Sequence, residues 1–249
     1  MIYNTVLITG ATSGIGKATA ELLADKKCRL ILCGRRTERL EALRDSLPTE
    51  VITLSFDVRD KNAVEKAFAG LPKGWEPDVL VNNAGNAHGL APLQEGDVAD
   101  WDAMIDINVK GLLYVTKAIL PGMVARNRGY IINIGSIAGK EVYPGGNVYC
   151  ASKHAVDAIN QGLRIDLNGT GIKVSAINPG LVETEFSLVR FKGDEKRAGK
   201  VYQGMDALQG RDIAEIIAFM LSRPQHVNIA DLLVLPQAQA SSTIVHRDS

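Results

Sequence analysis

Short apolar runs alternate with amphipathic stretches along most of the chain. The runs have the length and β-branched content of buried strands, and they cover Thr5 to Thr9, Leu30 to Cys33, Val51 to Phe56, Val79 to Val81, Tyr130 to Ile134 and Val174 to Ile177. Helical spacing of apolar residues between them predicts helices over Lys17 to Lys26, Thr37 to Leu47, Lys61 to Ala69, Trp101 to Ala125, Tyr149 to Leu167 and from near Asp212. The alternation predicts an α/β fold, a doubly wound parallel sheet of about seven strands with helices on both faces.

Polar and glycine residues follow the end of nearly every predicted strand. They are Thr9-Gly10, Gly34-Arg35, Asp57, Asn82-Asn83, Ser136 and Asn178-Pro179. In an open parallel sheet, ligands bind beyond the carboxyl ends of the strands. The sequence therefore predicts one site at this edge of the sheet.

The first of these motifs is a glycine-rich turn between a strand and a helix. Gly10, Gly14 and Gly16 are spaced Gly-x-x-x-Gly-x-Gly. At such a turn, backbone N–H groups point toward a pyrophosphate, and glycines allow the backbone to approach it closely. The turn favours nucleotide binding.

Tyr149 and Lys153 are four residues apart, so on a helix they share one face. A free tyrosine titrates near ~10, and lowering its pKa to ~7 requires about 4 kcal/mol of preferential phenolate stabilisation. A nearby lysine and a positively charged nicotinamide ring are candidate sources of that stabilisation. The alternative for the pair alone is ordinary packing of a surface tyrosine and a lysine stem.

Together these motifs resemble the classical short-chain dehydrogenase/reductase family over essentially the whole chain. The matching segments are Thr9-Gly10 to Gly16, Asn82-Asn83-Ala84-Gly85, the tetrad Asn108, Ser136, Tyr149 and Lys153, and Asn178-Pro179-Gly180. The resemblance implies a single Rossmann-type domain over residues 1–249 and a homotetramer built on the helices at 101–125 and 149–167. It implies a catalytic role for the tetrad, in which Asn108 kinks its helix and holds a water linked to the lysine. It also implies cofactor contacts from Gly10, Thr12, Ser13, Gly14, Ile15, Gly16, Asp57, Val58, Asn83, Ala84, Gly85, Tyr149, Lys153, Pro179, Gly180, Val182 and Thr184.

The end of the second predicted strand indicates which nicotinamide cofactor is bound. An NAD enzyme of this type has an acid there for the ribose hydroxyls, but this chain has Arg35 and Arg36 and no acid before Glu38. Guanidinium groups bind phosphate well. The two arginines favour NADP over NAD, and the alternative is a solvated basic turn.

The segment from Leu181 to Gly210 is expected to form a lid over the active site. Its stretch Thr184 to Asp194, with Gly145 to Val148 and Leu120 to Met123, resembles the NADP-dependent 3-hydroxy acid dehydrogenases within the family. The resemblance implies oxidation of L-serine, L-allo-threonine and related short 3-hydroxy acids such as 3-hydroxypropionate, with substrate contacts from Ser136, Asn147, Tyr149 and Arg190. Arg190 and Lys192 are both candidates for the carboxylate, and the alternative is that they are surface charges or subunit contacts. Reduction of 3-oxoacyl thioesters and a non-catalytic NADP-binding sensor remain alternative functions.

Composition excludes several other classes of function. Lys plus Arg and Asp plus Glu number 28 each among 249 residues, so no bulk charge favours nucleic acid or an anionic membrane. Three cysteines without a pairing pattern and the lack of a signal peptide or membrane-length apolar run predict a cytoplasmic protein. His88, His226 and His246 lack metal-ligand spacing, so no metal is expected. Cys150 and His154 adjoin the Tyr149–Lys153 pair but are expected to point elsewhere.

Overall fold

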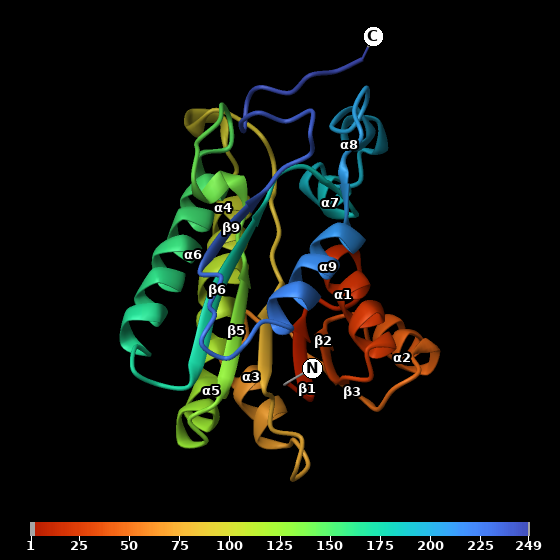
Figure 1. The fold of residues 1–249 in the computed structure, drawn as a ribbon. Coiled ribbons are helices and arrows are strands. Elements are labelled where there is room, and N and C mark those ends of the chain that lie inside the picture. Colours follow the sequence, from red (N-terminus) through yellow and green to blue (C-terminus); the bar gives the residue numbers. More distant parts are fainter. Residues whose placement is uncertain (1–2, 249) are drawn as a thin grey trace.

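A computed structural model describes residues 3–248 of the chain. Its main sheet has seven parallel strands in the order β3-β2-β1-β4-β5-β6-β9 (Figure 1). The strands are β1 (Thr5–Thr9), β2 (Arg29–Gly34), β3 (Val51–Ser55), β4 (Val79–Asn82), β5 (Gly129–Ile134), β6 (Ile172–Pro179) and β9 (Asp231–Val234). The order reverses between β1 and β4, which is where doubly wound sheets bind their ligands.

Helices cover both faces of this sheet. They are α1 (Gly14–Asp25), α2 (Thr37–Ser46), α3 (Lys61–Ala69), α4 (Val98–Ile105), α5 (Leu112–Ala125), α6 (Asn147–Asp166) and α9 (Gly210–Leu221). In Figure 1, α1, α2 and α9 lie on one side of the sheet and α4, α5 and α6 on the other. The predicted α/β fold class is therefore confirmed.

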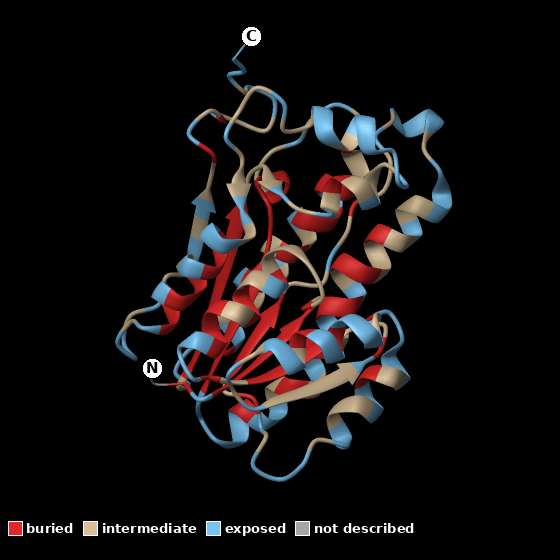
Figure 2. Ribbon diagram, turned by 90° about the vertical axis from the view of Figure 1, so that its right-hand side faces the viewer, coloured by how far each residue is buried: buried red, intermediate tan, exposed pale blue. Residues whose placement is uncertain are grey.

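Burial explains why the central strands read as continuous apolar runs. All five residues of β1 and all six of β5 are buried, because helices pack on both sides of the sheet. Figure 2 shows the buried residues concentrated in the sheet and on the inner faces of its helices. Two apolar clusters result, one between the sheet and α1 and α9, the other between the sheet and α3 and α5.

Two features differ from the sequence-based expectation. The hydrophobic pattern does not locate the seventh strand, β9, because this edge strand has only four residues, of which none is fully buried. The helix expected over 101–125 is divided into α4, a π-helical turn at Asp106–Gly111 and α5. Such π turns are frequent at functional sites, and this one contains Asn108.

The segment 181–210 lies over the carboxyl edge of the sheet and forms short elements of its own. These are β7 (Val182–Glu183), α7 (Phe186–Arg190), α8 (Glu195–Lys200) and β8 (Leu208–Gln209), with β7 and β8 paired in parallel. The C-terminal tail packs on this segment, since Arg247 donates to the carbonyl oxygens of Val201 and Gln203. The tail therefore contacts its own chain.

Candidate active site

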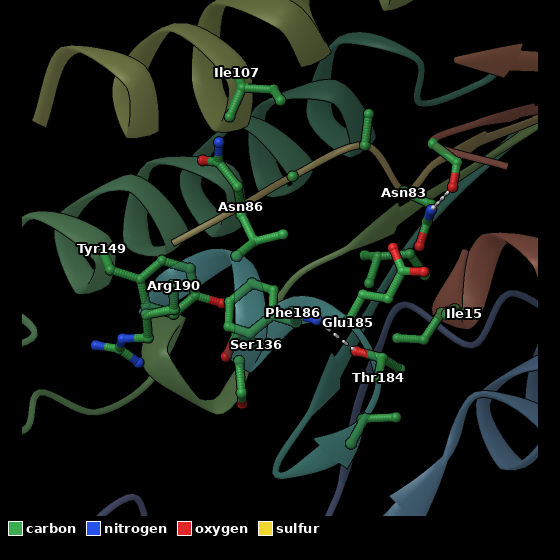
Figure 3. A pocket seen from close by; sticks show the side chains of 18 of the residues that line it. Ile15, Asn83, Asn86, Ile107, Ser136, Tyr149, Thr184, Glu185, Phe186 and Arg190 are labelled. Carbon is green, nitrogen blue, oxygen red and sulfur yellow. Dashed lines mark hydrogen bonds between the residues drawn. The ribbon is translucent and has the colours of Figure 1, made fainter. Parts of the chain in front are cut away.

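A cavity of about 760 Å³ is lined by residues at the carboxyl edge of the sheet and by residues of the segment 181–210. Its lining includes all of the predicted site residues except Gly16, Asn108 and Asn147. Tyr149, Arg190 and Ser136 gather at one end of it and Ile15 and Asn83 at the other (Figure 3). The structure therefore brings together residues that are far apart in the sequence.

The glycine-rich turn forms the cofactor-side wall of this cavity. Gly10 and Gly14 have φ values of 65° and 52°, a region that disfavours side chains. Asn83, at the end of β4, donates from its amide to the carbonyl oxygens of Thr9 and Gly10 at 2.9 and 3.1 Å. With those carbonyls held, the N–H groups at the start of α1 remain available for a pyrophosphate.

Gly16 supports the turn by its lack of a side chain. A Cβ at this position would lie 2.4 Å from the Gly10 carbonyl oxygen and 2.5 Å from Asn83 Nδ2. We expect Gly16→Ala to lower the free energy of unfolding by about 1–3 kcal/mol, because backbone or Asn83 must move. Gly162→Ala is the matched control, because apart from the chain neighbours and the nearby backbone of its own helix no described heavy atom lies within 4 Å of the added Cβ. This substitution should stabilise α6 by about 0.5–1 kcal/mol. Chemical denaturation measures both changes, and an unchanged stability of Gly16→Ala would contradict the packing role.

Tyr149 and Lys153 project from α6 into the cavity, as their spacing predicts, and both are buried. Lys153 Nζ donates to the carbonyl oxygen of Ile134, 3.0 Å away at the end of β5. Ser136 follows β5 and hydrogen-bonds Tyr149 through its side chain. A phenol, a serine hydroxyl and an ammonium therefore meet where a substrate oxygen can be bound.

Burial dominates the protonation of this group. It raises the pKa of Tyr149 well above the ordinary value, and the hydrogen bond from Ser136 and the charge of Arg190 oppose this only in part. Burial also lowers the pKa of Lys153 to about 8. The expected lowering of the Tyr149 pKa by Lys153 is therefore not found in the protein alone, so a general base at this position needs a further positive charge.

Asn108 lies behind the cavity wall, in the π-helical turn, and is 2% exposed. Its Oδ1 accepts from the backbone N–H of Asn86 at 2.8 Å, and its Nδ2 donates to the Asn86 carbonyl oxygen at 2.8 Å and to Ser152 at 3.0 Å. Asn108 thus fixes the backbone that carries the Asn86 side chain. The water that the resemblance assigns to Asn108 stays a prediction.

The predicted basic residues line the cavity at the end of β2. Arg36 donates to the hydroxyl groups of Thr12 and Ser13 in the glycine-rich turn, at 2.8 and 3.0 Å. Arg35 lies 3.8 Å from the Asp57 carboxylate. Burial raises the pKa of Asp57, but hydrogen bonds from Arg59 outweigh it and hold that pKa below its usual value. The basic turn is therefore part of the cavity and not a detached surface loop.

The two candidates for a substrate carboxylate have different surroundings. Lys192 forms ion pairs with Asp97 at 3.5 Å and Asp100 at 3.0 Å, and it does not line the cavity. Arg190 lines it, and donates from Nε to the Gly89 carbonyl oxygen at 3.0 Å and from Nη1 to the Tyr143 hydroxyl at 2.9 Å. Its Nη2 is buried without a hydrogen-bond partner among the described residues. Of the two, only Arg190 lines the cavity and has a buried donor without a partner among the described residues.

Asn147 does not contact the cavity, because its Oδ1 accepts from the next backbone N–H, that of Val148, at the start of α6. Several lining residues were not predicted, among them Asn86, His88, Tyr143 and Phe186. The Phe186 ring lies 5.7 Å from that of Tyr149. Asn86 directly follows the Asn82–Gly85 motif, which is the one signal in the sequence that pointed to it.

Cys150 and His154, which adjoin the Tyr149–Lys153 pair in the sequence, do not line the cavity. Cys150 is buried in an apolar cluster with Met104 and Ala138, which confirms a packing role. His154 is exposed, with Nδ1 2.8 Å from the Cys150 carbonyl oxygen. Within residues 3–248, no three His, Cys, Asp or Glu side chains are grouped to hold a metal ion. The same residues include no helix long and apolar enough to span a membrane.

Comparison with known proteins agrees with the site. The short chain dehydrogenase family model matches residues 4–194. An NADP-dependent 3-hydroxy acid dehydrogenase of Salmonella typhi is 50% identical over 245 residues, covering 97% of this chain and 99% of that protein. A serine 3-dehydrogenase of Rhizobium radiobacter is 43% identical over 98% of this chain and 99% of its own.

A solved structure described as the closed form of serine dehydrogenase complexed with NADP⁺ has a TM-score of 0.92 and 47% identity, and covers 98% of this chain and 100% of that one. The region that the family model matches includes the glycine-rich turn and the tetrad. The chain therefore belongs to the short-chain dehydrogenase family.

Proposed function

We propose that this protein is an NADP-dependent dehydrogenase that oxidises the hydroxyl group of short 3-hydroxy acids. The observation that carries the proposal is the position of Arg190, a cationic side chain that lines the same cavity as Tyr149 and Ser136 and whose buried Nη2 has no hydrogen-bond partner among the described residues. Relatives named 3-hydroxy acid and serine dehydrogenases support the substrate class. A structural neighbour with bound NADP⁺ supports the cofactor.

The cavity residues fit such a cofactor. Gly10 and Thr12 to Ile15 would hold the pyrophosphate, Arg35 and Arg36 the 2′-phosphate, and Asp57 and Val58 the adenine. The nicotinamide end would be held by Pro179, Gly180, Val182 and Thr184. When bound, the oxidised nicotinamide supplies a hydride acceptor and a positive charge near the phenol. That charge is the further stabilisation of the phenolate that the buried Tyr149 lacks.

Three protein residues carry out proton transfer, substrate orientation and phenolate stabilisation. Tyr149 accepts the proton of the substrate hydroxyl as general base, and returns it as general acid in the reverse direction. Ser136 hydrogen-bonds the same oxygen and orients the carbinol carbon. Lys153 would bind the nicotinamide ribose, and its ammonium would add to the nicotinamide charge in stabilising the phenolate.

The proton transfer predicts opposite pH dependences for the two directions. Oxidation needs the phenolate of Tyr149. The kcat/KM for oxidation should therefore rise with pH until the pH exceeds the pKa of Tyr149 in the complex with NADP⁺. Carbonyl reduction needs the neutral phenol and should fall over the same range. Initial rates in both directions between about pH 6 and 10 test this. A rise with pH in both directions would contradict Tyr149 as the proton donor and acceptor.

The substrate carboxylate would take the free Nη2 of Arg190 in a charge-assisted hydrogen bond. Oxidation of L-serine at C3 gives 2-aminomalonate semialdehyde, a β-keto acid that loses CO2 without further catalytic groups. The expected products from L-serine are therefore NADPH, CO2 and aminoacetaldehyde. Accumulation of the intact semialdehyde would count against this last step.

The proposal is tested by NADPH formation at alkaline pH with L-serine, L-allo-threonine and 3-hydroxypropionate, with NAD⁺ as the comparison cofactor. Turnover with NADP⁺ and little with NAD⁺ would support both the substrate class and the role of Arg35 and Arg36. No turnover on these acids, together with oxidation of NADPH by an acetoacetyl thioester, would keep the proposed hydride-transfer mechanism but contradict short 3-hydroxy acids as the substrates. Binding of NADP⁺ without turnover on either would identify a sensor.

A cytoplasmic homotetramer stays a prediction. Of the apolar residues expected to form subunit contacts, Leu112, Ile119 and Val156 are buried within the chain, whereas Leu113 is 42% exposed. Val124, also on α5, is 47% exposed. These two side chains support an interface on α5, and analytical ultracentrifugation would measure the assembly.

A further inference from the structure

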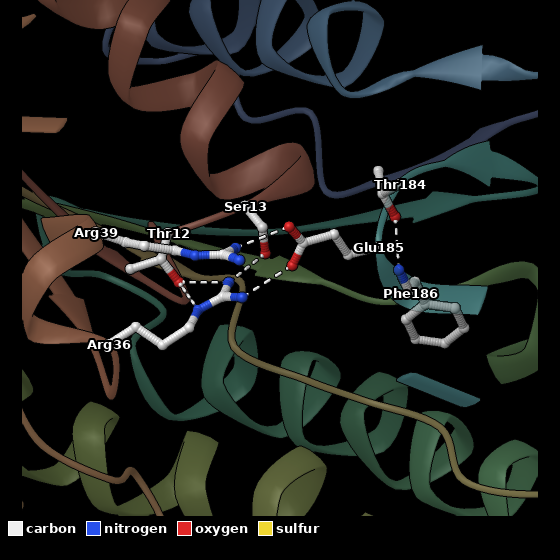
Figure 4. A network of polar contacts seen from close by, with 7 residues as sticks. All are labelled: Thr12, Ser13, Arg36, Arg39, Thr184, Glu185 and Phe186. Carbon is white, nitrogen blue, oxygen red and sulfur yellow. Dashed lines mark hydrogen bonds and ion pairs between the residues drawn. The ribbon is translucent and has the colours of Figure 1, made fainter. Parts of the chain in front are cut away.

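A carboxylate from the segment 181–210 lies between two arginines at the adenosine end of the cavity. Glu185 accepts from Arg36 Nη1 at 2.9 Å through Oε2, and from Arg39 Nη1 at 2.8 Å through Oε1 (Figure 4). Arg36 also donates to Thr12 and Ser13. We call Arg36, Arg39 and Glu185 the arginine–glutamate cluster.

The cluster has the donor set of a phosphate subsite. Two guanidinium groups and two hydroxyl groups of the glycine-rich turn converge on one small region at the end of β2 and the start of α2. Guanidinium forks bind carboxylate and phosphate oxygens alike. Glu185 therefore satisfies the cations that, under the NADP binding proposed above, would bind the 2′-phosphate.

We propose that Glu185 and the 2′-phosphate of the cofactor compete for the arginine–glutamate cluster, and that Arg39 is a second phosphate-binding residue. In the protein without cofactor, Glu185 holds α7 to the adenosine subsite. Binding of the 2′-phosphate displaces the Glu185 carboxylate from the two arginines. The cluster thereby couples recognition of the phosphate to the position of the segment that covers the substrate.

The exposure of the cluster makes this exchange feasible. The side chains of Arg36, Arg39 and Glu185 are 40%, 52% and 43% exposed, so solvent screens both ion pairs and each is weak. A 2′-phosphate carries up to two negative charges and three acceptor oxygens, against one charge for Glu185. Hydrogen bonds from Arg36 hold the pKa of Glu185 below its usual value, so the competitor is ionised at neutral pH.

Displacement of the Glu185 carboxylate would change the position of α7 at the catalytic end of the cavity. Phe186, the next residue along the chain, begins α7 and packs against the ring of Tyr149, and Arg190 ends the same helix. A movement of Glu185 thus acts on a five-residue helix whose two ends both contact the substrate region. No comparable link is expected for NAD, which has no group to replace Glu185.

Binding of adenosine 2′,5′-bisphosphate and of 5′-AMP, measured by calorimetry, tests the competition without turnover. Glu185→Gln should bind the bisphosphate about 3- to 10-fold more tightly than wild type, since each exposed pair is worth little, and should bind 5′-AMP equally. Arg39→Met should weaken only the bisphosphate, by about 3- to 10-fold. Glu183→Gln removes the same charge two residues away, at a carboxylate bonded to Gln209, and should bind both ligands as wild type does.

Hydrogen exchange supplies a readout of the segment itself. The bisphosphate should raise amide exchange over Phe186–Arg190 in wild type, because it releases Glu185 and offers no nicotinamide to hold α7. In Glu185→Gln this exchange should already be high without ligand and should not rise further.

Weaker binding of the bisphosphate by Glu185→Gln would overturn the competition and make Glu185 a support for Arg36. Unchanged exchange over α7 in wild type would overturn the coupling. Arg36→Met tests separately whether the 2′-phosphate binds at this turn, independently of the competition with Glu185 and of the coupling to α7. It should lose about 10- to 100-fold in bisphosphate affinity, and if it loses none, the 2′-phosphate does not bind at this turn at all.

Discussion

Tyr149→Phe should lower kcat for 3-hydroxy acid oxidation by about 10²–10⁴-fold while binding of NADP⁺ stays close to that of wild type. The substitution removes one hydroxyl group from a buried ring and leaves the packing against Phe186 in place. Ser136 and Lys153 remain, but in the proposed mechanism neither of them accepts the substrate proton. Steady-state rates with 3-hydroxypropionate and calorimetric binding of NADP⁺ measure the two effects separately.

Tyr143→Phe is the matched control for this loss. Tyr143 also lines the cavity, and its hydroxyl accepts a hydrogen bond from Arg190 Nη1 at 2.9 Å. Its removal should raise KM through Arg190 and leave kcat largely intact. Equal losses of kcat in the two variants would show that Tyr149 is not the specific proton acceptor.

Arg190→Met should raise KM for 3-hydroxypropionate by about 10- to 150-fold, the range expected for loss of a hydrogen bond to a charged group. Arg190 also lowers the pKa of Tyr149, so its removal makes the phenolate less stable. The rising limb of the oxidation rate should therefore move to higher pH in this variant. A full pH profile of kcat and KM separates loss of carboxylate binding from loss of phenolate stabilisation.

Lys192→Met provides the control for the loss of a cation on the same segment. Lys192 is bound to Asp97 and Asp100 and lies outside the cavity lining, so KM and the pH profile should stay near wild type. If Lys192→Met raised KM as much as Arg190→Met, the carboxylate would not be recognised by Arg190 itself.

Much of the fold follows from the sequence because its central strands are buried on both faces. Such strands read as uninterrupted apolar runs, and six of the seven strands of the main sheet are located in this way. The short edge strand β9 has no such pattern, because the rest of the protein covers this strand only in part. The π-helical turn around Asn108 is likewise absent from the hydrophobic periodicity, which continues through it.

The site residues likewise fall into those that the sequence could predict and those that it could not. Residues in contiguous motifs, such as the glycine-rich turn and the Tyr149–Lys153 pair, could be predicted because their spacing determines which face they share. Contacts between distant segments could not: Glu185 meets Arg36 across 149 positions, and Arg190 meets Gly89 across 101. In the protein without cofactor the pKa of Tyr149 lies above its ordinary value, because burial outweighs the nearby charges, and the extent of burial is not visible in the spacing. The lowering expected from a lysine together with the nicotinamide charge stays a prediction.

The most direct test of the central claim compares kcat/KM of the wild-type protein for 3-hydroxypropionate and for its methyl ester, with NADP⁺. The two substrates present the same alcohol, but only the acid carries a charge for the free Nη2 of Arg190. The account predicts that the acid is preferred by about 10-fold or more, and that Arg190→Met abolishes the preference. Equal values for acid and ester in the wild-type protein would contradict the assignment of short 3-hydroxy acids as substrates.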